Sequence, residues 1–172
     1  MWGENKSMDA VEVCANAVEI LYNIASIGGE LAEIVSEEPN IIDRLLIVLK
    51  RLINHTEAIH SGSAGASQKE REIAKGKLQT IGNISRRLSM IILNFLTIIE
   101  HRKQQSVISL HHFNHNLNHS HNHNHSLDHH TERSFSGLST LELFVEICLL
   151  ASSYEHTSDC ERILSKAIRK LS

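Results

Sequence analysis

The chain has 172 residues, of which 41% are hydrophobic and only 4% aromatic, with a single proline and a formal net charge of −3. This length is sufficient for one domain with a hydrophobic core. A core of Ile and Leu with so few aromatic residues points to helices and argues against a β-sandwich or a barrel. The small net charge argues against a general affinity for polyanions.

Charge is distributed unevenly along the chain. Residues 1–43 carry nine acidic residues and one basic residue, whereas residues 69–103 carry eight basic and three acidic residues. This asymmetry is compatible with an acidic face and a basic face that meet different partners, and also with two ordinary solvated surfaces.

No segment of the sequence indicates secretion or membrane insertion. The first ten residues lack the apolar stretch of a signal peptide. The most apolar run, residues 88–100, is too short and too often interrupted by polar residues to span a bilayer. The three cysteines are scattered, and their odd number favours reduced thiols over a disulfide scaffold. We therefore expect a soluble intracellular protein without a membrane partner.

The first helix is predicted over residues 9–26. Its apolar residues recur at alternating steps of three and four, which places them on one face: Val11, Cys14, Val18, Leu21 and Ala25. The Ile-Gly-Gly sequence at 27–29 ends this helix, because glycine readily adopts the left-handed conformation. A short helix follows until Pro39, and Asn40 is the candidate N-cap of a strongly apolar helix over residues 40–54.

Small residues at 55–67 predict a flexible loop. Ser67 and Glu70 have the spacing of a capping box, in which each residue's side chain bonds the other's backbone amide. They open a polar helix predicted over residues 68–79. The next helix, over 85–103, is apolar on nearly every face, which indicates a central position in the fold.

The last two helices are also predicted from capping boxes, at Ser139 with Glu142 and at Ser158 with Glu161. In the final helix the apolar residues are predicted to face the core: Ile163, Leu164, Ala167, Ile168 and Leu171. Its basic residues are predicted to face outward: Arg162, Lys166, Arg169 and Lys170. No segment has the pattern of a β-strand.

Two of the predicted helices resemble each other. Residues 17–27 and 88–98 align without gaps, and Asn23 falls on Asn94 among apolar neighbours. A helix, a turn and a second apolar helix form the unit of an α-solenoid, in which stacking buries the apolar faces. The sequence therefore predicts a short α-solenoid. The alternative is a coincidental match, since any two amphipathic helices necessarily share apolar spacing.

Residues 111–130 contain nine histidines and five asparagines. Imidazole binds Zn, Ni and Cu, but these histidines lack the fixed spacing of a structural metal site. The composition favours a disordered linker, predicted over residues 109–137. Four histidines remain weak candidates for adventitious metal binding: His119, His121, His123 and His125. No metal or organic cofactor is otherwise expected.

No catalytic or nucleic-acid-binding motif is present in the sequence. We found no nucleophile with a base, paired carboxylates, phosphate-binding loop or zincin helix. The basic segments lack interleaved aromatic residues and any finger or helix-turn-helix signature. The sequence therefore argues against direct nucleic-acid binding. These observations favour a non-enzymatic protein-interaction scaffold that binds no small molecule.

Three segments, residues 14–26, 85–108 and 141–172, have the general pattern of armadillo-type repeats. In order and spacing they resemble part of the C-terminal armadillo-like domain of Osa-type AT-rich-interaction-domain subunits of SWI/SNF chromatin remodellers. The resemblance is carried by ten residues: Trp2, Cys14, Asn23, Ile24, Arg87, Leu88, Leu143, Phe144, Cys160 and Glu161. Here the family's tryptophan cluster is reduced to Trp2, the inter-helix loop lacks the family's proline, and the AT-rich interaction domain is absent, so DNA binding by that domain is not carried over.

The resemblance implies one armadillo-like domain over residues 1–172 that docks other protein subunits of a nuclear chromatin-remodelling complex. Candidate contacts are Asn23, Asn94 and the basic residues of the final helix. Two alternatives remain open: a cytoplasmic armadillo-type adaptor, and a metal-binding protein that uses the histidine tract.

Overall fold

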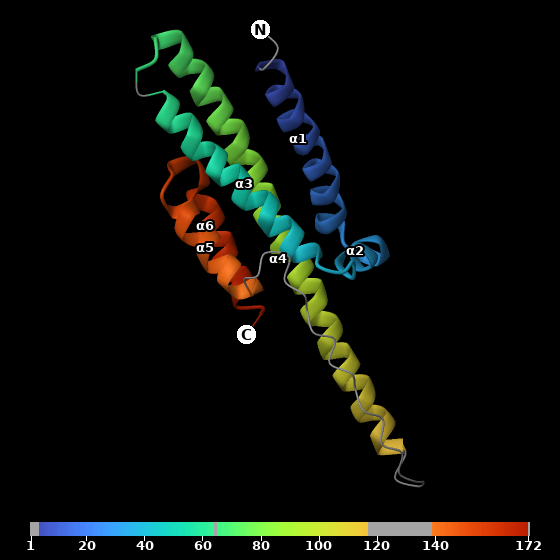
Figure 1. Cartoon of the computed structure of the whole chain (residues 1–172). Coiled ribbons are helices and arrows are strands. Elements are labelled where there is room, and N and C mark those ends of the chain that lie inside the picture. Colours follow the sequence, from blue (N-terminus) through green and yellow to red (C-terminus); the bar gives the residue numbers. More distant parts are fainter. Residues whose placement is uncertain (1–3, 64, 117–138, 172) are drawn as a thin grey trace.

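The computed structural model describes residues 4–63, 65–116 and 139–171 (Figure 1). These residues form six α-helices and a short 3-10 helix and contain no strand, so the all-helical prediction is confirmed. The elements are α1 (Glu4–Ile27), α2 (Gly29–Ser36), α3 (Ile41–Gly62), α4 (Gln68–Asn116), α5 (Thr140–Ser152), η1 (Glu155–Thr157) and α6 (Ser158–Ile168).

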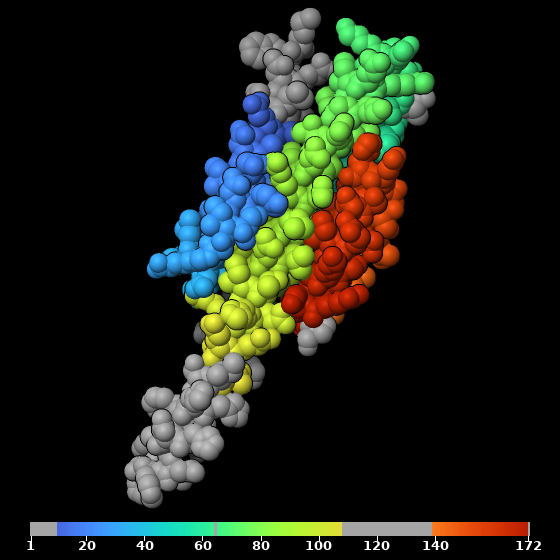
Figure 2. Space-filling model, turned by 180° about the vertical axis from the view of Figure 1, so that it is seen from behind, coloured from blue at the N-terminus to red at the C-terminus, as the bar shows by residue number. Residues whose placement is uncertain are grey.

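Helix α4 is the centre of the fold. It packs against α1, α2, α3, η1 and α6, and it lies between α1 and the α5–α6 pair in both views of the molecule (Figures 1 and 2). Its buried side chains recur at steps of three and four and form one broad face, which several neighbouring helices share: Ile81, Ile84, Leu88, Ile91, Ile92, Phe95 and Leu96. The predicted central position of this segment is confirmed.

One hydrophobic cluster joins α1, α3, α4, α5 and α6. Helix α3 contributes Leu46 and Leu49, and α5 contributes Phe144, all of them fully buried. Helices α5 and α6 pack on each other, and α5 also packs on α3. The two C-terminal helices therefore share their core with the central helices.

The predicted break after α1 is confirmed. Gly28 and Gly29 have φ angles of 72° and 76°, in the left-handed region that glycine enters without a steric penalty. Helix α2 ends at Ser36, ahead of Pro39. Asn40 precedes α3 as predicted, but its φ is 60° and its side chain makes no capping hydrogen bond. Asn40 instead allows the turn before α3 by adopting the left-handed backbone conformation, which asparagine tolerates better than most residues.

The flexible loop predicted over residues 55–67 is wrong for its first eight residues, because α3 continues to Gly62. Thr56 is fully buried, and its hydroxyl donates to the Leu52 carbonyl at 3.2 Å. The His60 ring stacks on Tyr154 with centroids 5.6 Å apart. The burial of Thr56 and the stacking of His60 on Tyr154 hold a segment of small residues in the helix, against its weak intrinsic preference.

Residues 68–79 and 85–103 do not form two helices, since both belong to the 49-residue helix α4. The buried residues that cross the expected break keep the helical steps of three and four: Leu78, Ile81, Ser85, Leu88 and Ile92. Their packing outweighs the low helix propensity of Gly82.

The linker predicted over residues 109–137 is wrong at its start, because α4 extends to Asn116. An existing helix adds one hydrogen bond per residue without a new nucleation cost. The remainder of the predicted linker, with His119, His121, His123 and His125, lies outside the described residues, which resume at 139.

Two of the three predicted capping boxes are confirmed. The Glu70 carboxylate accepts from the Ser67 amide at 2.7 Å, and the Glu142 carboxylate accepts from the Ser139 amide at 2.8 Å. The third, at Ser158 with Glu161, is wrong. The Ser158 hydroxyl donates to the Glu155 carbonyl of η1, because the preceding turn already lies beneath it, and Glu161 accepts from Ser165 instead.

Candidate protein-binding surface

Helix α1 carries two apolar stripes. The inner stripe is the predicted one, and its Val18 and Ala25 are buried against the core. The second, which we call the outer stripe, consists of Ala10, Val13, Ala17, Ile20, Ile24 and Ile27. Its steps of three and four residues are those of a coiled-coil seam.

The outer stripe is open to solvent. Val13 is 67% exposed, Ile20 61% and Ile27 84%. These residues are seven apart and therefore lie on one side of the helix. Ala10 and Ala17 are also exposed, and Ile24 is half-buried. An exposed apolar strip over five helical turns is typical of a surface that binds another molecule.

The surroundings of the outer stripe are acidic. Residues 10–38 include six glutamates and no lysine, arginine or histidine. Glu19 forms an ion pair with Arg87 of α4, and Glu33 and Glu37 both pair with Arg102. The other three glutamates are exposed and form no ion pair within the described part of the chain: Glu12, Glu30 and Glu38.

A smaller exposed apolar stripe lies on α5, where Leu141, Val145 and Leu149 follow one another at steps of four. Helices α1 and α5 lie on opposite sides of the central α4 (Figure 1). The two exposed apolar faces therefore belong to peripheral helices.

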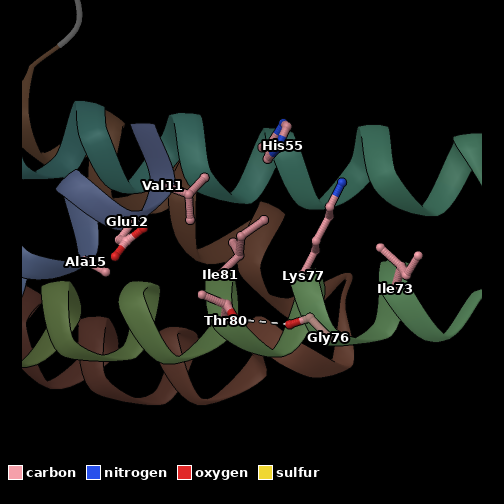
Figure 3. Close-up of a pocket in the computed structure, with 9 residues that line it drawn as sticks. All are labelled: Val11, Glu12, Ala15, His55, Ile73, Gly76, Lys77, Thr80 and Ile81. Atoms are coloured by element: carbon pink, nitrogen blue, oxygen red, sulfur yellow. Dashed lines mark hydrogen bonds between the residues drawn. The ribbon is translucent and has the colours of Figure 1, made fainter. Parts of the chain in front are cut away.

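A groove of about 440 Å³ opens near the N-terminal end of α1, between α1, α3 and α4 (Figure 3). It is lined by Val11, Glu12, Ala15, His55, Ile73, Gly76, Lys77, Thr80 and Ile81. The Thr80 hydroxyl donates to the Gly76 carbonyl at 3.0 Å and does not bond across the groove. Val11 and Ala15 are each two residues from Val13, which places the groove on the opposite side of α1 from the outer stripe.

The predicted contact residues do not form one surface. Asn23 is exposed on α1, whereas the Asn94 side-chain amide donates to the Ala25 carbonyl at 3.3 Å and ties α4 to the end of α1. The two asparagines that align in the repeat thus have different surroundings. Arg162 of α6 pairs with Asp159, and Lys170, which lies beyond the end of α6, pairs with Glu100. Lys166 and Arg169 are exposed.

The sequence prediction missed the outer stripe, although its spacing is visible in the sequence. The inner stripe alone predicts the helix, so the prediction made no use of the outer stripe. Two apolar stripes on one helix predict two neighbours, and within the described residues α1 packs mainly on α4, with a smaller contact to α2.

The span Ala10–Ile27 of α1 is long and apolar enough to cross a bilayer, with a mean hydropathy of 1.3. It also contains Glu12, Asn16, Glu19 and Asn23. The ion pair of Glu19 with Arg87, and the packing of Val18 and Ala25 in the core, connect this helix to the helical bundle. Polar groups of this kind are costly in hydrocarbon, so the arrangement favours a peripheral bundle helix.

None of the three thiols has the environment of a nucleophile. Burial raises the pKa of the Cys160 thiol to about 11, and it also raises the pKa values of Cys14 and Cys148. Within the described residues, no three His, Cys, Asp or Glu side chains gather in a possible metal site.

We expect Cys160 to be the slowest of the three cysteines to react with iodoacetamide in the native protein at pH 8. Thiolate is the reactive form, and a pKa near 11 leaves only about one thiol in a thousand ionised at this pH. Peptide mass mapping after timed alkylation measures each rate. In urea all three cysteines should react alike, and a Cys160 that reacts first in the native state would contradict its burial.

Comparison of the chain with protein-family models, with curated proteins and with solved structures gave no match.

Proposed function

We propose that this protein is a non-enzymatic interaction scaffold that binds a protein partner through the outer stripe of α1. The observation that carries the proposal is the exposure of Val13, Ile20 and Ile27 on one side of a helix whose opposite side is packed in the core. Burial of one such side chain contributes about 1.5–3 kcal/mol. Apolar residues at these spacings are the usual contacts between a helix and a protein groove or a second helix.

The positions of the two exposed apolar faces support an armadillo-like arrangement. In a helical-repeat protein each repeat is covered by its neighbours, so the outer helices of an isolated block expose apolar residues. Helices α1 and α5 have this property. Docking to other subunits of a nuclear chromatin-remodelling complex remains a proposal that rests on the sequence resemblance. The cytoplasmic adaptor and the metal-binding histidine tract are its alternatives.

We expect Ile20→Glu to abolish partner capture, because a carboxylate in the middle of the stripe must be desolvated on binding. The chain would be immobilised and exposed to nuclear and to cytoplasmic extracts, with bound proteins quantified by mass spectrometry. Leu149→Glu is the matched control, since it places the same charge on the exposed face of α5. Both variants should keep the helical circular dichroism of the parent chain.

Proteins lost by about tenfold or more with Ile20→Glu but retained with Leu149→Glu would identify the partner and its compartment. Remodeller subunits in this set would support the assembly that we propose. Equal recovery by the parent chain and Ile20→Glu would contradict docking through the outer stripe. A chain lacking residues 111–130 is tested in parallel, and the full chain is also tested with a chelator. Unchanged capture in both tests indicates a spacer, whereas capture lost in both indicates a metal-dependent contact.

A further inference from the structure

We propose that the outer stripe receives an amphipathic helix whose apolar edge is flanked by lysine and arginine. This inference rests on the proposed function and specifies its partner by chemistry. It follows from two properties of the surface, the spacing of the apolar residues and the charge around them.

The spacing matches a second helix. From Ala10 to Ile27 the stripe alternates steps of three and four, so its positions recur every seven residues, the spacing at which two helices remain in contact along their length. Those 18 residues extend over about 27 Å. The small residues Ala10 and Ala17 alternate along the stripe with Val13 and Ile20, so they leave recesses for the large side chains of a partner helix. A partner helix of about five turns would cover the stripe.

The charge selects the kind of helix. Glu12 and Glu19 directly precede Val13 and Ile20, so both lie about 100° around α1 from the stripe. Arg87 compensates the charge of Glu19, whereas the single charge of Arg102 is shared by two carboxylates, Glu33 and Glu37, so one negative charge is left there. Further negative charge belongs to Glu12 on α1 and to Glu30 and Glu38 at α2, beyond the C-terminal end of α1. That end also carries the negative pole of the helix dipole.

The negative charge around the outer stripe disfavours two other occupants, a second copy of the chain and an anionic lipid surface. A second copy that presented its own α1 would place acidic surface against acidic surface, and one that presented the α5 face would bring the exposed Glu142 toward it. An anionic lipid surface would be repelled for the same reason. A basic helix gains from the excess negative charge of α1 and α2, and electrostatic complementarity of this kind raises both association rate and specificity.

The test uses two synthetic helices of 21 residues, each with leucine at the apolar seam positions. One carries lysine at the flanking positions and the other glutamate, and both carry the same fluorescent label. Anisotropy titrations with the full chain are made at 50 mM and 500 mM NaCl. We expect the basic helix to bind at least about tenfold more tightly at low salt, and this preference to shrink at high salt as the charges are screened.

Variants locate the effect. Glu12→Gln, Glu30→Gln and Glu38→Gln together should remove most of the preference for the basic helix. The matched control replaces three other exposed glutamates, Glu57, Glu72 and Glu155, by glutamine. It changes the net charge equally and should preserve the preference. Loss of the preference in the control alone would overturn the assignment of these carboxylates.

The outcomes separate this inference from the proposed function. If both peptides bind equally and Ile20→Glu abolishes both, the stripe is a docking surface without charge selection and only the inference fails. If neither peptide binds and extracts yield no stripe-dependent partner, both fail. Two further results would overturn the inference if the Ile20→Glu substitution abolishes them. One is binding of the chain to vesicles of 70% phosphatidylcholine and 30% phosphatidylserine, and the other is a dimer detected by light scattering.

Discussion

Replacing Phe95 with alanine is expected to lower the free energy of unfolding by about 3–5 kcal/mol. Phe95 is fully buried on α4, the helix that contacts most of the others. Truncation removes the apolar contacts of the ring and leaves a cavity that rigid neighbouring helices cannot close. Urea denaturation followed by circular dichroism measures the loss. For a chain of this size it corresponds to roughly 6–20 °C in Tm.

Leu149→Ala is the control for this experiment. The leucine lies on α5 with its side chain largely in solvent, and its truncation should change stability by no more than about 0.5 kcal/mol. A Phe95→Ala protein that unfolds at the parent midpoint would show that α4 is not the packed centre of the bundle.

The second large effect is expected at Gly82, where alanine should destabilise the protein by about 1–3 kcal/mol. A Cβ atom at this position would lie 2.5 Å from the backbone carbonyl oxygen of His156 and 3.3 Å from the His156 Cβ. No side-chain rotation relieves a clash with backbone, so α4 and η1 must move apart. Gly82 therefore permits the close approach of these two elements.

Gly76→Ala is the matched control, because both glycines lie in α4 but only Gly82 is in close contact with another element. A Cβ atom at Gly76 meets nothing within 4 Å, and the exchange should stabilise the helix by about 0.5–1 kcal/mol. Denaturation midpoints of the two variants should thus shift in opposite directions. Stabilisation by Gly82→Ala would contradict the contact with His156.

The outer stripe also affects local stability. Within the described residues, α1 packs on α2 and α4 and leaves Val13, Ile20 and Ile27 in water. Helices with few buried contacts open more readily than the core of their protein. A partner helix would therefore stabilise α1 as it binds, by the ordinary linkage between binding and folding.

The sequence by itself determined the helical class and most helix boundaries. Those signals are local: Gly28 and Gly29 adopt positive φ angles, Pro39 blocks continuation of α2, and two serine–glutamate pairs close capping boxes. Each of these signals depends on only a few consecutive residues, so it does not require contacts with distant parts of the chain. The inner stripe of α1 was predicted on the same grounds, since its period is a property of one helix.

Only the tertiary structure decided where local signals are overridden. Thr56 and His60 remain helical because α3 packs there, and α4 passes through Gly82 because buried residues on both sides keep its register. Ser158 fails as a cap because η1 precedes it. The candidate site depended on the same information. Spacing marks two apolar stripes on α1, but which of them is covered depends on neighbours distant in sequence, and burial by those neighbours is what separates a core face from a binding face.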